Sequence, residues 1–281
     1  MKNSRKSLLA LITLLFTVFT VEAGTRAVIE VEIIKGDNIE KSFEIVSFDE
    51  KRFRIDILGE DKKKTEQTPY IMTVNNGENW VIGDKPKDKF YCSEMQTEEF
   101  FKNLGDQVTN AIEFFNVKAE SPTVKQILEE PGPEILGYKT THVQIETNAR
   151  AYAWFLFLKF EYSVKIIDDL WYTTDIEMHP VRKKWINALT QSGNSIIDSL
   201  FADFTAKLPG PVLKTESVVS ITDARKKETK TQTIRTVITE VDELESGELD
   251  EIFKMPECQT MDDDEVQEKA KVIFSTGRGA I

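Results

Sequence analysis

The chain has 281 residues, of which 40% are hydrophobic and 17 are Phe, so it can bury a substantial folded core. Its 48 acidic and 36 basic residues give a formal net charge of -12, which disfavours binding to nucleic acid or to anionic membranes. Only two histidines and two cysteines are present, so the sequence offers few of the residues that nucleophilic and metal catalysis use.

The N-terminus predicts secretion. Lys2, Arg5 and Lys6 precede an apolar run over residues 8–21, and a small residue, Ala23, follows it. This pattern is typical of a signal peptide that is cleaved after Ala23. An uncleaved anchor is the alternative, but the run of about fourteen residues is short against the roughly twenty that span a bilayer. We therefore expect a periplasmic or extracellular mature chain from residue 24, with no integral membrane span.

Alternating residues over 25–95 predict an antiparallel meander. Ala27, Ile29, Val31 and Ile33 would share one face of the first strand. Further strands are expected over residues 42–48, 52–58, 70–74, 79–82 and 89–95.

The motif "NNGENWVIGDKPKDKFYCSEM" over 75–95 contains two of the predicted turns. Asn76-Gly77 suits a tight hairpin turn because both residues tolerate positive φ. Trp80 and Tyr91 would lie on adjacent strands, where aromatic side chains commonly stabilise a sheet by cross-strand packing. We interpret both as scaffold rather than as ligand contacts.

Two amphipathic helices are expected, each with one apolar face. The first begins near Thr97 and continues to Phe115, with apolar residues at helical spacing. The second begins at Pro180 and carries Trp185 and Phe204 on one face, with Gly193 as a weak point in its middle.

The strongest apolar pattern lies between these helices. After a strand over 136–149, the motif "AYAWFLFLKFEYSVKI" predicts one long strand whose first half is apolar on both faces, so it is buried twice or lines a cavity. A short strand over 171–176 follows, and a hairpin of two strands is expected over 212–222 and 231–241. The last structured signal is 252–256, and the acidic end of the chain is expected to be loosely ordered.

Cys92 and Cys258 both fall in the predicted mature chain. An oxidising compartment allows them to form a disulfide, and two separate buried thiols are the alternative. Neither belongs to a CxxC pair, so a bridge would be structural.

No catalytic motif is recognisable in the sequence. His142 falls on a predicted strand and His179 directly before a helix, and we interpret both as structural. Gly-x-Ser-x-Gly, phosphate-loop and His-Glu-x-x-His motifs are missing, so we expect no enzyme, no metal and no cofactor. Asp168-Asp169 and the acidic run 262–264 lack calcium-loop spacing and are interpreted as solvated acidic patches.

About eleven strands and two helices without βαβ alternation predict an α+β fold that is mostly β. We expect one strongly curved antiparallel sheet with both helices on one face. The domain organisation would be a signal peptide over 1–23, a single domain over 24–260 and an acidic tail over 261–281.

Several motifs carry a family resemblance. "ENWVIGDKPKDKFYCSEM", "ILGYKTTHVQI", "DLWYTTDI" and "LDEIFKMPE" together resemble the bacterial domain-of-unknown-function 4412 family and, more distantly, envelope lipoprotein carriers of the LolA and LolB type. The resemblance covers most of residues 25–257. It implies a half-barrel whose concave, apolar side is covered by helices and holds acyl chains in the carriers. It implies no catalytic residues.

Two functions are compatible with these patterns. In the first, an apolar half-barrel cavity binds an acyl chain, a lipoprotein or another amphiphile. In the second, the cavity is filled by its own aromatic side chains, and the protein is a structural component or pairs a sheet edge with a partner. The candidate cavity residues are Trp154, Phe155, Phe157, Phe160, Trp185 and Phe204. Which face of the sheet is concave is left open by the sequence.

Overall fold

The computed structural model describes residues 24–65, 68–84, 91–114, 117–155, 158–254 and 259–260. The side chains of residues 74, 84, 91–93, 104, 107, 108, 111–114, 117, 153–155, 158, 159, 259 and 260 are outside the description. The predicted signal peptide and acidic tail both lie outside the described residues.

One sheet of thirteen strands organises the described chain, in the order β13-β6-β5-β4-β3-β2-β1-β12-β11-β10-β9-β7, with β8 also paired to β9. All neighbouring strands are antiparallel except β13 and β6. The strands are β1 (Gly24–Lys35), β2 (Asn38–Phe48), β3 (Phe53–Leu58), β4 (Tyr70–Val74), β5 (Asn79–Asp84), β6 (Tyr91–Gln96), β7 (Val117–Ala119), β8 (Thr123–Pro131), β9 (Thr141–Phe155), β10 (Leu158–Tyr172), β11 (Val212–Asp223), β12 (Glu228–Leu244) and β13 (Gln259–Thr260).

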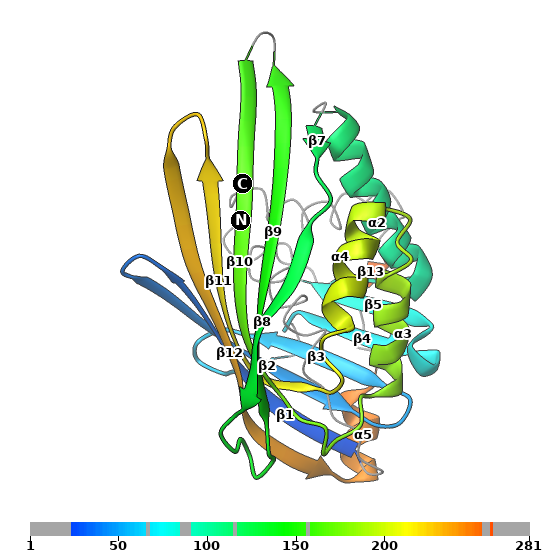
Figure 1. Ribbon diagram of the computed structural model, residues 1–281. Helices are drawn as coiled ribbons and strands as arrows, with labels where there is room; N and C mark the ends of the chain where they lie inside the picture. The colour runs from blue at the N-terminus through cyan, green and yellow to red at the C-terminus, as the bar shows by residue number, and fades with distance from the viewer. Residues whose placement is uncertain are drawn as a thin grey trace.

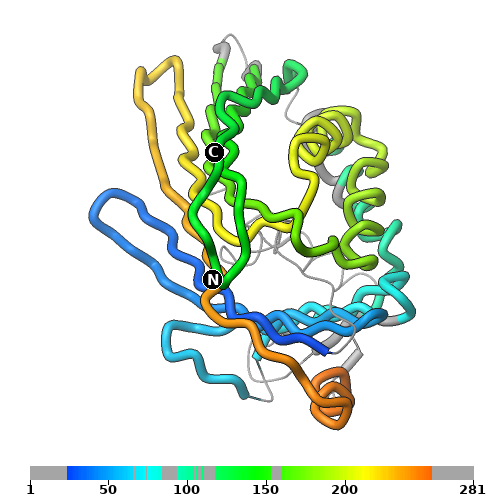
Figure 2. The backbone as a smooth tube through the Cα atoms, turned by 60° about the horizontal axis from the view of Figure 1, so that its bottom comes forward, coloured from blue at the N-terminus to red at the C-terminus, as the bar shows by residue number. Residues whose placement is uncertain are grey.

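The sheet curves without closing into a barrel, and helices lie inside the curve (Figures 1 and 2). These are α2 (Thr97–Phe114), α3 (Pro180–Leu189) and α4 (Ser195–Thr205). A shorter helix, α5 (Ser246–Ile252), packs on the outer face, where Leu249 belongs to a small cluster with Tyr70 and Met72. The predicted fold class, a curved antiparallel half-barrel with helices on one face, is confirmed, and the concave face is the one that α2, α3 and α4 cover.

The alternation predicted for the first strand is confirmed. Ala27, Ile29, Val31 and Ile33 of β1 are 1–6% exposed, and the residues between them are half-buried. Because successive side chains of a strand point to opposite faces, this register aims the apolar residues at the concave side. The turn after β4 is also confirmed, since Asn76 and Gly77 have φ of 60° and 78°.

The prediction of one long strand over the aromatic motif is wrong. β9 and β10 are two strands of a hairpin, and their backbones pair Phe155 with Leu158 and Tyr172 with Thr141. The sequence between the paired Phe155 and Leu158 contains no Gly, Pro, Asn or Asp that would mark a turn. Of the short strand expected over 171–176, only residues 171 and 172 are in a strand, as the end of β10, and residues 173–176 follow it without strand structure.

The predicted second helix is two helices. α3 ends before Thr190, and α4 begins after Asn194, whose side chain accepts hydrogen bonds from the Ile196 and Ile197 amides at 3.1 and 3.2 Å. Gly193 lies in the break with φ of 82°, a conformation that favours glycine. The weak point expected at this glycine is therefore the place where the helix ends.

Trp80 and Tyr91 lie on adjacent strands as predicted, but they are not cross-strand neighbours. Trp80 pairs with Met95, and Tyr91 pairs with Asp84. Trp80 is fully buried, so the packing role predicted for it is confirmed. The side chain of Tyr91 lies outside the description.

Candidate functional site

The candidate site is the concave face of the sheet together with α2, α3 and α4. Its apolar side chains come from strands far apart in sequence, because the sheet runs from the N-terminal meander through β1 and β12 to the β9–β10 hairpin. The main buried cluster collects them: Ala27, Ile29, Val31, Val46, Phe48, Phe53, Ile55, Trp80, Phe100, Phe101, Val143, Ile145, Leu170, Tyr172, Val181, Trp185, Leu189, Leu208, Val212, Leu213 and Ile238.

One half of this face is filled by aromatic side chains, and we call it the packed half. The ring of Trp80 stacks on Phe100 with centroids 4.6 Å apart and lies 4.4 Å from the ring of Trp185. Trp185 in turn meets Phe53 edge-on at 4.8 Å. These four side chains are 0–4% exposed, so α2 and α3 are packed directly onto β3 and β5. The packed half consists of Phe48, Phe53, Trp80, Phe100, Phe101 and Trp185.

His179 fixes the start of α3 over the packed half. Its Nδ1 accepts a hydrogen bond from the Val181 amide at 3.2 Å, so Nε2 carries the proton and donates to the Asp49 carbonyl at 2.5 Å. Burial lowers the pKa of His179, which favours this neutral form. The prediction that His179 is a structural residue at a helix start is confirmed.

Beyond the main buried cluster, a group of apolar side chains on the concave face is only half-buried, and we call it the open half. Its strand residues lie on the same face as Leu170. On β10 they occupy every second position from Leu170, and β11 places Val219 opposite Ile166 and Ile221 opposite Val164. All of them are intermediate in exposure and lie outside the main buried cluster. They are Tyr162, Val164, Ile166, Val219 and Ile221.

Helix α4 supplies the other part of the open half. Its sequence, SIIDSLFADFT, is rich in apolar residues, yet it buries none of them completely. Ile197, Phe201 and Phe204 pack against the edge of the main cluster and stay partly exposed. By contrast, α3 buries Val181, Arg182, Trp185 and Leu189. The covering layer is therefore tight over the packed half and loose over the open half.

Two carboxylic acids lie on the concave face where the packed half ends. Glu44 lies two residues before Val46 on the same face of β2, and Asp168 lies two residues before Leu170 on the same face of β10. Burial raises the pKa of Glu44 to about 8 and that of Asp168 to about 6. Asp168 accepts a hydrogen bond from the Ser217 hydroxyl at 2.5 Å, so the solvated patch predicted for Asp168 is wrong.

The candidate residues chosen from the sequence are dispersed. Trp185 is a core residue of the packed half, and Phe204 lies on the partly exposed face of α4. Phe160 is half-buried near the far end of β10, with the Arg225 guanidinium 5.2 Å from its ring. Phe157 and the side chains of Trp154 and Phe155 are outside the description, so their role stays a prediction.

The Cys92–Cys258 disulfide also stays a prediction. Cys258 and the Cys92 side chain lie outside the description. The backbone pairing of β13 with β6 places Gln259, which follows Cys258, beside Tyr91, which precedes Cys92.

His142 lies on the outer face, away from the candidate site. Its ring nitrogens lie 2.8 Å from Asp169 and 3.2 Å from Glu130, and its ring stacks on Trp171 with centroids 4.6 Å apart. These contacts join β8, β9 and β10, which agrees with the structural role predicted for His142. Asp169 belongs to this network, so the solvated acidic patch predicted for it is wrong.

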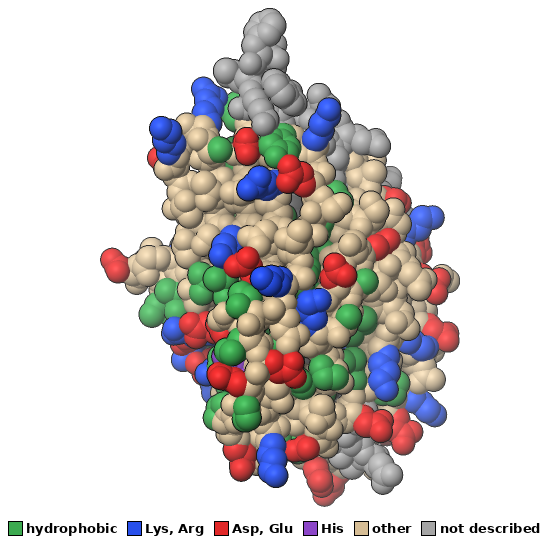
Figure 3. All heavy atoms as spheres, in the orientation of Figure 1, with side chains coloured by type: hydrophobic (Ala, Val, Ile, Leu, Met, Phe, Trp, Pro, Cys, Tyr) green, Lys and Arg blue, Asp and Glu red, His purple; other side chains and the backbone are tan. Residues whose placement is uncertain are grey.

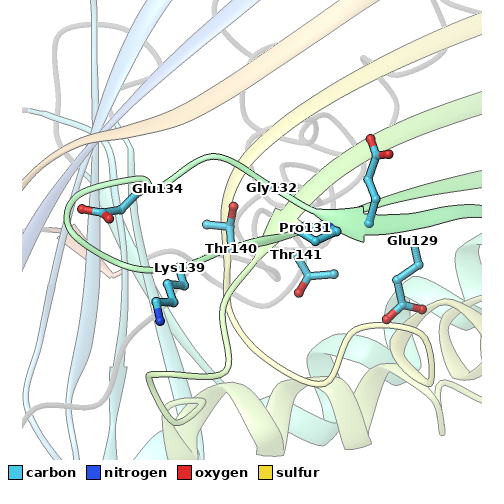
Figure 4. A pocket seen from close by; sticks show the side chains of 8 residues that line it. Glu129, Pro131, Gly132, Glu134, Lys139, Thr140 and Thr141 are labelled. Carbon is cyan, nitrogen blue, oxygen red and sulfur yellow. The ribbon is translucent and has the colours of Figure 1, made fainter.

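A hollow lies in the loop between β8 and β9. It has a volume of about 770 Å3, and Figure 4 shows Glu129, Glu134, Lys139 and Thr140 around it. Most of its lining residues are charged or polar, and all of them come from one segment, residues 129–141. It therefore lacks the apolar walls from several elements that the concave face provides.

No family model matches the sequence, and no curated protein matches it. Among solved structures, PNGF-II is similar at 12% identity and a TM-score of 0.37, over 90% of this chain and 33% of that one. The chain thus spans about a third of the length of PNGF-II.

Two smaller proteins are similar over nearly their whole lengths. A LolA superfamily protein, NE2245 from Nitrosomonas europaea, is 8% identical with a TM-score of 0.28, over 89% of this chain and 97% of that one. A domain of an outer membrane lipoprotein-sorting protein from Vibrio parahaemolyticus is 8% identical with a TM-score of 0.27, over 89% and 98%. Likeness at this level assigns neither a family nor an activity to the chain, so the resemblance to the 4412 family stays a prediction.

No helix in the described part of the chain is long and apolar enough to cross a membrane. The side of the molecule shown in Figure 3 carries acidic and basic side chains, with hydrophobic side chains visible between them.

Proposed function

We propose that the protein is a non-enzymatic binding protein of the cell envelope that holds an acyl chain, lipoprotein or other amphiphile on the concave face of its half-barrel. The observation that carries this proposal is the open half, where apolar strand and helix side chains face the inside of the curve and remain half-exposed. Exposed apolar surface is costly in water, and an alkyl chain would cover it.

The energetics of such a ligand are favourable. Each CH2 group removed from water contributes roughly 0.8 kcal/mol before the costs of ordering the ligand. A chain of about a dozen methylenes would therefore retain useful affinity even if the open half covered only part of it. The predicted signal peptide agrees with a site of action in the periplasm or outside the cell.

The strand β11 provides a matched pair of variants to test the proposal. Val218 and Val219 are neighbours of the same type, and both are half-buried. Val219 lies on the concave face, opposite Ile166, whereas Val218 lies on the outer face, opposite Ile167. We expect Val219→Glu to weaken binding of a fluorescent fatty-acid probe at least tenfold and Val218→Glu to change it less than twofold.

Native mass spectrometry of protein purified from its own envelope, followed by organic extraction, tests the proposal without a chosen probe. We expect an extractable apolar adduct in gentle preparations. Protein that carries no adduct and binds no probe would show that the proposed function is wrong.

A second candidate function, pairing with a partner strand, is favoured by β8. Among the described strands, β8 pairs only with β9, so its other edge is available. Ile127 and Leu128 of β8 are 49% and 37% exposed, which is high for large apolar side chains. Proline substitution at Ile127 would reduce co-purification of such a partner and leave probe binding unchanged.

A further inference from the structure

Glu44 is a buried acid for which the fold supplies no partner. It is 3% exposed, and among the described residues it forms no hydrogen bond or ion pair. Its neighbours across the sheet on the concave face are Ile29 of β1 and Ile57 of β3. A buried carboxyl group normally has a hydrogen-bond partner, so an unpaired one on a binding surface indicates a group that a ligand completes.

The charged residues on the neighbouring strands do not neutralise Glu44. On β1 and β2, Glu30 and Glu32 pair with Lys41 on the opposite face, at 2.6 and 3.4 Å.

On β3, Arg54 and Asp56 also face outward, where they pair at 2.8 Å beneath α5. Arg182 of α3 is buried in the covering layer, and the pKa of Glu44 is raised by burial.

The position of Glu44 fits the polar end of an amphiphile. On the same face of β2, Val46 and Phe48 extend from Glu44 toward the packed half. Ser42 and the exposed Glu40 lie along the strand in the opposite direction. Asp168, on the same face of β10, is also an acid, and the residues beside Glu44 on this face of β1, β2 and β3 include no basic side chain. An anionic head group would meet no complementary charge from the sheet there, and an ammonium group would.

We propose that Glu44 binds the ammonium head group of an amphiphile whose alkyl chain runs along the concave face toward the open half. This inference rests on the proposed function. The ammonium would donate a charge-assisted hydrogen bond to the carboxylate, and the carboxyl would lose its proton to solvent on binding. Removal of that proton is easier at higher pH, so affinity for an amine should rise with pH, and affinity for an alcohol of the same chain length should not.

Displacement of Nile red from the full chain by dodecylamine, dodecanol and dodecanoate tests the inference. At pH 8 we expect wild type to bind dodecylamine at least tenfold more tightly than dodecanol, and dodecanoate most weakly. Glu44→Gln should bring dodecylamine within twofold of dodecanol and leave dodecanol binding unchanged, which also reports that the variant is folded. Between pH 6 and pH 8, dodecylamine affinity of wild type should rise about tenfold or more, because the ionised fraction of a group with a pKa of about 8 rises steeply there.

The outcomes separate this inference from the proposed function. If dodecanol binds but Glu44→Gln leaves the amine preference unchanged, or no preference exists, the role of Glu44 is wrong and the proposed function stands. If neither Nile red nor any of the three amphiphiles binds, both are wrong.

Two further ligands distinguish the source of the amine. Lysophosphatidylethanolamine represents a lipid, and a dodecanoylated peptide with a free lysine represents an acylated protein. Each ligand is compared with its own N-acetylated form. If either free amine binds more tightly than its N-acetylated form, the inference is supported and the source of the amine is identified. Equal binding of the free and N-acetylated forms of both ligands contradicts the inference.

Discussion

The packed half and the open half belong to one sheet with one alternation of side chains, yet they are covered differently. Over the packed half, Trp185 of α3 reaches Trp80 and Phe53 and leaves them almost no exposed surface. Over the open half, α4 presents Phe201 and Phe204 without burying them fully. The comparison teaches that the helices, not the strands, determine whether a concave sheet becomes a buried core or stays half-exposed.

The largest expected effect on stability comes from disrupting the packed half. Trp185→Ala removes a fully buried aromatic side chain and should lower the free energy of unfolding by about 3–5 kcal/mol. Urea denaturation measures it, with Trp171→Ala on the half-exposed outer face as the control. Equal losses in the two variants would show that Trp185 contributes no more than a half-exposed aromatic residue, which would contradict the packed half.

The next effect concerns pH. The folded state raises the pKa of Glu44 from 4.5 to about 8, so it holds a proton that the unfolded chain releases. The contribution of Glu44 to the free energy of unfolding is fully present below pH 4.5 and is lost as pH rises through about 8. The free energy of unfolding changes by on the order of 4 kcal/mol over this range. Glu44→Gln should therefore be more stable relative to wild type at pH 9 than at pH 5, as urea unfolding at both pH values would show. Glu40→Gln, on the exposed end of β2, should lack this difference.

The smallest effect on stability is expected in the open half. Phe201→Ala should lower the free energy of unfolding by only about 1–2 kcal/mol, because the side chain is already partly exposed. Its effect on binding should be larger, with the affinity for Nile red falling about fivefold or more. A variant with the stability loss of Trp185→Ala and normal binding would show that α4 is core rather than binding surface.

The sequence predicts the fold best where local signals are complete. The alternation through Ala27, Ile29 and Val31 and the Asn76-Gly77 turn both appear in the structure as expected. The β9–β10 hairpin was missed because the sequence between its two strands is apolar and contains no turn-forming residue. The strand β8 was missed because it is exposed at the edge of the sheet and pairs through a bulge near Leu128, so its residues carry no clear alternation.

The candidate site was predictable only in part. The helical spacing of Trp185 and Phe204 correctly assigns them to the covering layer, but it cannot show that a break at Gly193 gives them different environments. Glu44 was missed, although a signal existed: in "SFEIVSF" it occupies the same alternating position as Val46 and Phe48. An acid in the apolar register of a strand marks a polar group on the buried face.

Both ends of α4 are anchored to other parts of the molecule. At its start, the Asn194 side chain donates to Thr109 of α2 at 2.9 Å. Beyond its end, Thr173 donates its amide to the Pro211 carbonyl at 3.0 Å, and any side chain at Gly210 would collide with the Thr173 carbonyl. Eleven helical residues span about 16 Å, so α4 acts as a strut of fixed length between two attachments. It can roll about its own axis or tilt slightly, and it cannot swing away from the sheet unless one attachment breaks.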